Sequence, residues 1–242
     1  MHTDPGSSMP SYRVGIIRFP GTNCDIDTWE ALTLVPDLAP VWVSHRENND
    51  PDLSALILPG GFSYGDYLRT GSIAAQSPVM NLVTDYARRG KPVLGICNGF
   101  QILSEAGLLP GVLLTNNSRT FLCQEEGLVV DRTDTPFTGL FAPGTRIALP
   151  IAHQEGRFFL DPDQLQEIER SGQVLVRYSK NPNGSVHDIA GVTNSAGNVA
   201  GLMPHPERRT RGGLSAPYGF PFFQSLALWL SKHLSDKENP TH

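Results

Sequence analysis

Gly90–Gln101 reads G-K-P-V-L-G-I-C-N-G-F-Q, a strand signal that runs directly into a helix signal. The apolar, β-branched run from Val93 to Ile96 follows a glycine and a proline and predicts a buried strand. After Cys97 the apolar residues recur at helical spacing, so a helix is expected to begin within a residue or two of the cysteine. A short buried strand that passes into a helix is typical of α/β sheets.

Gly95, Cys97 and Gly99 form the pattern G-x-C-x-G across this join, which is the nucleophile-elbow pattern with a thiol in place of the hydroxyl. The glycines allow neighbouring chain to approach closely, and the tight turn presents the sulfur at the carboxyl edge of the sheet. The first N–H groups of the helix and its dipole favour the thiolate, which is the reactive form. A buried structural cysteine is the alternative, but the flanking glycines favour a nucleophile.

The segments before this motif repeat the order of strand, loop and helix. Asp25 is expected to be the N-cap of a first helix, and Pro78 lies near the start of a second helix at 73–89. The strands expected before the cysteine are 12–19, 41–44 and 53–58. This alternation predicts an α/β fold with a doubly wound, mostly parallel sheet of flavodoxin-like type, in which sites lie at the carboxyl ends of strands.

The second half of the chain has a more antiparallel character. Turn residues separate the strands expected there, which are 112–116, 121–130, 145–151, 174–178, 189–193 and 199–202. Further helices are expected at 163–171 and 221–234. We expect a single domain over residues 12–235, a flexible leader at 1–11 and a polar tail at 236–242.

The composition is that of a globular protein, with 242 residues, 39% of them apolar and 18% charged. A net charge of −5 without a long basic run argues against nucleic acid as the main partner. The three cysteines lack C-x-x-C spacing, which argues against a disulfide framework and a zinc site and fits a reducing cytoplasm. No apolar run is long enough to span a membrane.

The expected strand 199–202 is followed by P-H-P-E, in which His205 and Glu207 lie two residues apart. The prolines stiffen this segment. A cysteine nucleophile needs an imidazole that a carboxylate orients, because the imidazole takes the thiol proton and later protonates the leaving group. The alternative is a His and a Glu on the surface. Because this pair follows another predicted strand end, as the elbow does, we favour a triad of Cys97, His205 and Glu207.

Two backbone N–H groups are candidates for an oxyanion hole, those of Gly61 after the third strand and of Asn98 after the nucleophile. An ordinary turn explains Gly60-Gly61 equally well from the sequence alone. His153, also near a carboxylate, is a rival base, although a loop histidine bonded to backbone is the favoured interpretation.

The remaining cysteines and a run of arginines have plain structural interpretations. Cys24 is expected to be a half-buried small residue and Cys123 a core residue of an apolar strand. Arg208, Arg209 and Arg211 are expected in a solvated loop, with an interface as the alternative.

Five motifs occur together on this chain: G-I-C-N-G-F-Q, L-P-G-G-F-S-Y-G-D, A-H-Q-E-G-R-F, N-P-N-G-S and G-L-M-P-H-P-E-R. With them the sequence resembles the class I (triad) glutamine amidotransferases from about Arg13 to Leu234. The opening F-P-G-T-N-C-D and the D-I-A-G after N-P-N-G-S make it more similar, within that class, to the glutaminase subunits of phosphoribosylformylglycinamidine synthase.

This resemblance implies that glutamine is hydrolysed through a γ-glutamyl thioester on Cys97. The ammonia would pass to a separate ATP-dependent synthetase subunit, which converts formylglycinamide ribonucleotide to the amidine in purine biosynthesis. A third small protein joins the complex in the small-subunit form of the enzyme. No cofactor or metal is implied in this chain, since ATP and magnesium are used by the synthetase partner.

The resemblance also implies roles for individual residues. Gly61 and Asn98 match the oxyanion-hole positions. The implied glutamine contacts are Gly60, Phe62, Gln101, Ser118 and Arg119. The chain departs from the family in reading N-N-S-R-T at 116–120, where N-N-S-G is usual, and in having Gln154 where Gly is expected.

Three other interpretations compete with a glutaminase subunit. A cysteine hydrolase of the PfpI/DJ-1 type also has a G-x-C elbow, but that group usually has His after the Cys, where this chain has Asn98, and lacks the late His-Pro-Glu. A stand-alone γ-glutamyl hydrolase is the second. The third, an inactive scaffolding subunit, gains no support from an intact triad.

Overall fold

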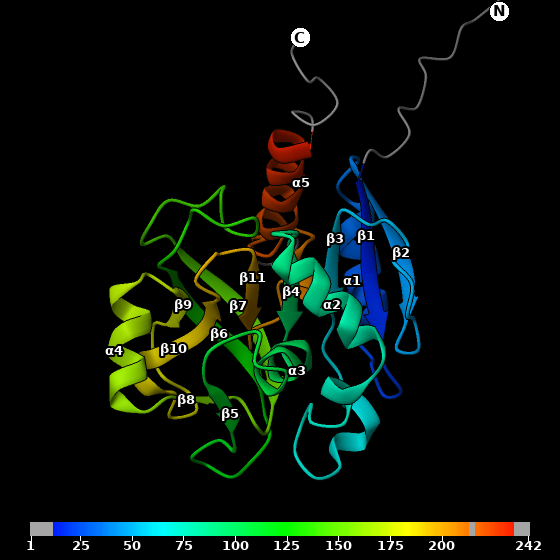
Figure 1. Cartoon of the computed structure of the whole chain (residues 1–242). Helices are drawn as coiled ribbons and strands as arrows, with labels where there is room; N and C mark the ends of the chain where they lie inside the picture. Colours follow the sequence, from blue (N-terminus) through cyan, green and yellow to red (C-terminus); the bar gives the residue numbers. More distant parts are fainter. Residues whose placement is uncertain (1–11, 213–215, 235–242) are drawn as a thin grey trace, which may run out of the picture.

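The computed structural model describes residues 12–212 and 216–234, drawn in colour in Figure 1. The expected leader at 1–11 and the tail at 236–242 lie outside the described residues. No helix in the described part of the chain is long and apolar enough to cross a membrane.

A nine-stranded sheet forms the centre of the described chain, in the order β2-β1-β3-β4-β11-β10-β9-β6-β7 (Figure 1). Its parallel part consists of β1 (Tyr12–Arg18), β2 (Leu38–Ser44), β3 (Ala55–Leu58), β4 (Val93–Ile96) and β11 (Val199–Leu202). Its antiparallel extension consists of β10 (Ile189–Thr193), β9 (Val174–Tyr178), β6 (Leu122–Val130) and β7 (Arg146–His153). The predicted α/β sheet and its antiparallel continuation are both confirmed.

The direction of winding places helices on both faces of the parallel strands. The chain passes from β1 outward to β2 but from β3 toward β4 in the opposite direction, so right-handed crossovers place α1 (Asp25–Thr33) and α2 (Val79–Arg88) on opposite faces. The long C-terminal helix α5 (Phe220–Leu234) contacts α1. Helix α3 (Asn98–Glu105) packs on β3, β4 and β11.

Short elements complete the chain. They are α4 (Pro162–Arg170), the two-stranded sheet of β5 (Val112–Leu114) and β8 (Arg157–Phe159), and the 3-10 turns η1 (Ser63–Asp66), η2 (Ala74–Gln76), η3 (Val186–Asp188) and η4 (Pro206–Arg209). Strand β8 was not predicted, whereas β5, equally short, lies within the expected strand 112–116.

Two helix starts differ from the prediction. The segment expected as one helix at 73–89 is divided, because Ser77 is extended before Pro78 and α2 begins only at Val79. The residue before a proline is driven out of the helical region by the proline ring. Asp25 is the first helical residue and Cys24 the cap; the Asp25 carboxylate pairs with Arg18 at 2.7 Å and accepts a bond from the Ile26 N–H.

The expectation that Cys123 is a core residue is wrong, because its side chain is exposed on β6. Cys123, Gln124 and Glu125 are consecutive and all exposed, so neither face of the first half of β6 is covered. Cys24 is fully buried rather than half-buried.

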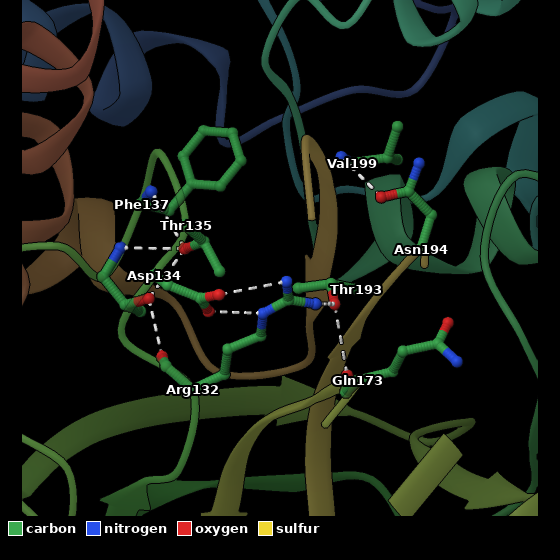
Figure 2. A network of polar contacts seen from close by, with 9 residues as sticks. Arg132, Asp134, Thr135, Phe137, Gln173, Thr193, Asn194 and Val199 are labelled. Atoms are coloured by element: carbon green, nitrogen blue, oxygen red, sulfur yellow. Dashed lines mark hydrogen bonds and ion pairs between the residues drawn. The ribbon is translucent and has the colours of Figure 1, made fainter. Parts of the chain in front are cut away.

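Beyond β6, the loop that leads toward β7 is fastened to the sheet by the polar network in Figure 2. The Arg132 guanidinium donates to Asp134 at 2.6 Å and to the Thr193 hydroxyl at 2.9 Å. The Thr135 hydroxyl accepts from the N–H groups of Phe137 and Thr138. A cavity of about 380 Å³ adjoins this network. The arginines that line this cavity are already paired with neighbouring carboxylates, so we interpret the cavity as part of the structure and not as a binding site.

Candidate active site

The residues that the sequence singled out meet where the parallel strands end. Cys97 follows β4 and His205 lies three residues beyond β11, and these strands are parallel neighbours with Ile96 opposite Leu202. The Cys97 N–H extends this pairing by donating to the Leu202 carbonyl at 2.8 Å. The loops after β1 and β3 meet at the same edge through a bridge between Thr22 and Gly61. The topology therefore creates a site at the switch in strand order.

Cys97 has the strained backbone of a nucleophile elbow, with φ at 50° and ψ at −105°. The flanking glycines allow the turn to pack. A Cβ on Gly95 would lie 2.6 Å from the backbone of Gly99, and a Cβ on Gly99 would overlap the carbonyl oxygen of Leu58. The expected close approach of neighbouring chain is thus present on both sides of the cysteine.

His205 and Glu207 form a buried pair, with Nδ1 and Oε1 separated by 2.6 Å and both side chains almost fully excluded from solvent. The His205 N–H donates to the Pro150 carbonyl at 2.8 Å, which ties this segment to β7. Burial opposes a charge on His205, but the Glu207 carboxylate and then the charge of Cys97 raise its pKa well above the usual 6.5. The imidazole of His205 can therefore hold a proton beside the Glu207 carboxylate.

Cys97 and His205 are close but not hydrogen-bonded. The Nε2 atom of His205 is buried and has no partner within the described part of the chain. The Cys97 thiol instead donates a weak bond to the Ala152 carbonyl, at 3.6 Å. A rotation of the thiol away from Ala152 is therefore needed before Nε2 can take its proton.

The two candidate oxyanion donors belong to different segments, Gly61 to the loop after β3 and Asn98 to the start of α3. Gly61 has a φ of 153° that suits only glycine, and in residues 12–212 and 216–234 nothing accepts its N–H. Asn98 is the first residue of α3, so its N–H has no partner in the helix. The Asn98 side chain accepts from the Ser63 N–H at 3.2 Å and donates to Gln101 at 3.0 Å, which holds the two segments together.

A cavity of about 260 Å³ opens beside Cys97. The predicted site residues Gly61, Phe62 and Gln101 line it. Ser118 and Arg119 are exposed and do not line it. The Ser118 hydroxyl binds Thr120, and the Arg119 N–H donates to the Asn116 carbonyl.

His153 also lines this cavity, but it lies at the end of β7 and bonds a side chain rather than backbone in a loop. The Asn116 amide nitrogen donates to the carbonyls of Thr120 and His153, so its oxygen is the acceptor that faces His153 Nδ1 at 3.1 Å. His153 therefore carries its proton on Nδ1 and presents a bare, buried Nε2. Burial, and then the charge of His205, lower the His153 pKa to about 4, so it is a weak base.

Sequence reasoning missed two carboxylates at this cavity, Asp66 and Glu155. Burial, and then the charge of Glu155, raise the pKa of Asp66 to about 6. The Thr70 hydroxyl donates to Glu155 at 2.5 Å, and the Gln101 side chain donates to the Glu155 carbonyl. Both acids occur in quoted motifs, G-G-F-S-Y-G-D and A-H-Q-E-G, where their polar character near glycines was the available signal.

The arginines after His-Pro-Glu pair with groups on other elements, while Arg208 and Arg211 remain exposed as expected. Arg208 donates to the Cys24 sulfur at 3.0 Å and pairs with Asp27. Arg209 pairs with Glu125 on β6, and Arg211 lies 3.6 Å from a carboxylate oxygen of Glu30 on α1. These contacts connect the segment after His205 to α1 and β6.

Known proteins resemble this chain in sequence and in fold. Residues 11–217 match the CobB/CobQ-like glutamine amidotransferase domain. Phosphoribosylformylglycinamidine synthase subunit PurQ of Thermus thermophilus is 50% identical over 221 residues, covering 88% of this chain and 97% of that protein. The subunit of the same name from Salinibacter ruber is 48% identical over 225 residues, covering 89% and 96%. A chain in the structure of PurLQS from Thermotoga maritima has a TM-score of 0.83 and 44% identity, covering 91% of this chain and 99% of that one.

Proposed function

Because this chain belongs to the family of PurQ subunits of phosphoribosylformylglycinamidine synthase, among the CobB/CobQ-like glutamine amidotransferases, we propose that it is the glutaminase subunit of that synthase. It hydrolyses glutamine to glutamate and ammonia. The ammonia passes to the synthetase subunit, which uses ATP to convert formylglycinamide ribonucleotide to formylglycinamidine ribonucleotide in purine biosynthesis.

The first chemical step is attack on the glutamine carboxamide. The Cys97 sulfur, freed from the Ala152 carbonyl, forms a bond to the carboxamide carbon while His205 holds the thiol proton. The carboxamide oxygen becomes an oxyanion, which the N–H groups of Gly61 and Asn98 stabilise. His205 then protonates the leaving nitrogen, the carbon–nitrogen bond breaks, and ammonia departs from a γ-glutamyl thioester.

The second step returns the enzyme to its starting state. His205 takes a proton from a water molecule, whose oxygen attacks the thioester carbon. The carbon–sulfur bond breaks, and Cys97 regains its proton as glutamate leaves. Glu207 keeps the imidazole in one orientation and stabilises its charged form through the 2.6 Å contact to Nδ1.

The partners and the location follow from this role. The synthetase partner is a PurL subunit, and a small PurS subunit is the third component; the Thermotoga maritima relative was solved as PurLQS. The requirement for ATP and magnesium is assigned to the synthetase, and this sequence has no G-x-x-x-x-G-K-[ST] motif of its own. We also propose a cytoplasmic location, because a reducing compartment keeps the Cys97 thiol free.

The observation that carries this proposal is the buried His205–Glu207 pair beside a strained cysteine at a cavity. The test uses Cys97→Ser in the reconstituted complex. Glutamine-dependent synthesis should be abolished while ammonia-dependent synthesis by the partner persists, because the thiol is needed only to release ammonia. A glutamine analogue with an electrophilic side chain should label Cys97 and spare Cys24 and Cys123.

Two results would count against a glutaminase subunit. Substantial glutamine-dependent synthesis by Cys97→Ser would show that the nucleophile lies elsewhere. Rapid hydrolysis of glutamine by the free chain, without any gain from the partner, would favour a stand-alone hydrolase of the PfpI/DJ-1 or γ-glutamyl hydrolase type.

A further inference from the structure

A second buried thiol, that of Cys24, lies next to the candidate triad and does not line the cavity beside Cys97. Ligand atoms of Cys24, His205 and Glu207 all lie within 4.8 Å of one another, and all three residues are buried. Thiolate, imidazole and carboxylate are the three ligand types that zinc takes from proteins. The spacing of cysteines along the sequence did not reveal this group, because Cys24 and His205 come together only through the sheet.

Gly60 provides the space that the group shares. A Cβ on this residue would lie 3.1 Å from the Cys24 sulfur and 3.4 Å from His205 Nδ1, so both ligand atoms border the volume that a side chain would fill. Zinc binds sulfur at about 2.3 Å and imidazole nitrogen at about 2.0–2.1 Å. Small movements of side chains thus suffice to bring both atoms to one ion.

One ligand atom in the group lacks a partner. Glu207 uses Oε1 for its contact with His205, while its Oε2 is buried without a hydrogen bond inside the described ranges. The whole Glu207 side chain is excluded from solvent. A buried carboxylate oxygen without a donor is costly and attracts a cation.

A separate cavity lies next to this group, with Glu207 as the one member of the group in its lining. It has a volume of about 410 Å³ and reaches Glu207, and its lining includes Asp27, Glu30, Arg208 and Arg211. Arg208 covers the Cys24 sulfur at 3.0 Å, yet it also lies 3.3 Å from the Asp27 carboxylate. The guanidinium can therefore leave the sulfur for Asp27 when a metal ion arrives.

We propose that Cys24, His205 Nδ1 and Glu207 form an inhibitory Zn²⁺ site at the catalytic pair. Binding releases the Cys24 thiol proton to solvent, moves the imidazole proton from Nδ1 to Nε2, and forms bonds from zinc to sulfur, nitrogen and carboxylate oxygen. A metal on Nδ1 fixes the remaining imidazole proton on Nε2. His205 then cannot take a proton from Cys97, so glutamine hydrolysis stops. Only the inhibition rests on the proposed function; the binding does not.

The binding test measures Zn²⁺ affinity by competition with a chromophoric chelator, on the chain freed of metal. Wild type, Cys97→Ser and Cys123→Ser should each bind one Zn²⁺ with equal affinity. Cys24→Ser should bind at least about 100-fold more weakly, since loss of a ligand exceeds the 10–100-fold effect of losing a supporting residue. Arg208→Gln should bind more tightly, by about tenfold, because a competing positive charge is removed.

The gain of affinity in Arg208→Gln guards against misfolding, since a damaged fold would not bind zinc better. In activity assays on the complex, Zn²⁺ should inhibit the wild type reversibly with a chelator and should inhibit Cys24→Ser only at much higher concentration, each relative to its own metal-free rate. Loss of binding in Cys97→Ser with full binding in Cys24→Ser would place the ion on the nucleophile and overturn the proposal. Absence of zinc binding in the wild type would also overturn it.

Discussion

At the scale of the residue, Gly60 is as much a part of the candidate site as the groups that carry the chemistry. Its missing side chain leaves room for the imidazole of His205, which sits against the backbone of the loop after β3. A Cβ at this position would lie 2.7 Å from His205 Cε1, closer than real Cβ atoms come to a neighbour. The position of the base is thus set from a loop far away in the sequence.

We therefore expect Gly60→Ala to slow thioester formation on the order of 10²-fold, because a misplacement of about 1 Å in a reacting group has that effect. Single-turnover acylation with an electrophilic glutamine analogue measures it. Gly127→Ala is the matched control, since a Cβ there would meet Ser179 only at 3.4 Å, in ordinary contact. Full acylation rates in Gly60→Ala would show that the imidazole has more freedom than its packing indicates.

Asp66 makes the stability of the protein depend on pH. Its pKa is raised from 3.8 to about 6, first by burial and then by Glu155, so the fold disfavours the ionised form. The contribution of the neutral Asp66 carboxyl to the stability of the fold is fully present below pH 3.8. It is lost as the pH rises through about 6, where the carboxyl ionises in the folded protein. Asp66→Asn should consequently raise Tm relative to wild type more at about pH 7.5 than at about pH 4.5.

Asp37→Asn, at an exposed position, is the control for this measurement, since it removes the same charge at the surface. Differential scanning fluorimetry at the two pH values is sufficient. A Tm difference between Asp66→Asn and wild type that is the same at both would mean that Asp66 is more fully solvated than the structure shows.

A site residue could be predicted when its motif lies within a few adjacent residues of the sequence. The elbow and His-Pro-Glu carry their chemistry within a few adjacent letters, so Cys97, His205 and Glu207 were singled out from the sequence. The tautomer of His153 depends on Asn116, 37 positions away in the chain. The position of Cys24 depends on Arg208, 184 positions away. Contacts of that kind have no signature in a single sequence.

At the scale of the element, the join of β4 and α3 depends on close backbone contact. Ala is a better helix former than Gly by about 1 kcal/mol, so propensity alone favours Gly99→Ala. A Cβ there, however, would overlap the Leu58 carbonyl oxygen on β3, and backbone cannot move aside as a side chain can. We expect Gly99→Ala to destabilise the protein by about 1–3 kcal/mol or more.

Urea unfolding followed by circular dichroism measures this loss, and Gly127→Ala again serves as the control that adds a methyl group without a clash. A neutral or stabilised Gly99→Ala would show that α3 can shift along β3 without cost. The elbow would then be more tolerant than its contacts indicate.

The predicted elements succeeded or failed for recognisable reasons. β9, β10 and β11 have the predicted bounds, because each is a compact run of apolar residues between turn residues. The helix at 73–89 was predicted too long, because its apolar spacing continues across Ser77 and Pro78 although the backbone is extended at Ser77. Cys123 was misplaced because strand pattern does not reveal that the first half of β6 extends beyond the elements that cover the sheet.

At the scale of the whole molecule, the structure is that of a glutaminase whose nucleophile and base are not yet in contact. The Cys97 thiol donates to the Ala152 carbonyl, while His205 Nε2 has no partner among the residues that the structure describes. The loop beside the cavity contains Tyr64, Asp66 and Leu68 in the left-handed region, which is strained for residues other than glycine. Strain of this kind favours a loop that changes conformation when another protein binds.

We accordingly expect the free chain to hydrolyse glutamine slowly and the complex to hydrolyse it faster, by up to roughly 10²–10³-fold if one oxyanion donor is brought into place. The measurement is kcat for glutamine on the purified chain, then with synthetase, nucleotide and acceptor substrate added in turn. Ammonia released without a partner would be protonated in water and lost to synthesis. A free chain that already reaches the rate of the full complex would contradict activation by the partner.

The adjacency of β4 and β11 has a consequence for the newly made protein. These neighbouring strands carry the nucleophile and the base, yet they are roughly a hundred residues apart in the chain. At a synthesis rate of about 5–20 residues per second, Cys97 leaves the ribosome about 5–20 s before His205. During that interval one edge of β4 has no neighbour, and the cysteine has neither base nor carboxylate. An unfinished chain therefore cannot consume glutamine, because the base and the carboxylate follow β11, the last of the parallel strands to be made.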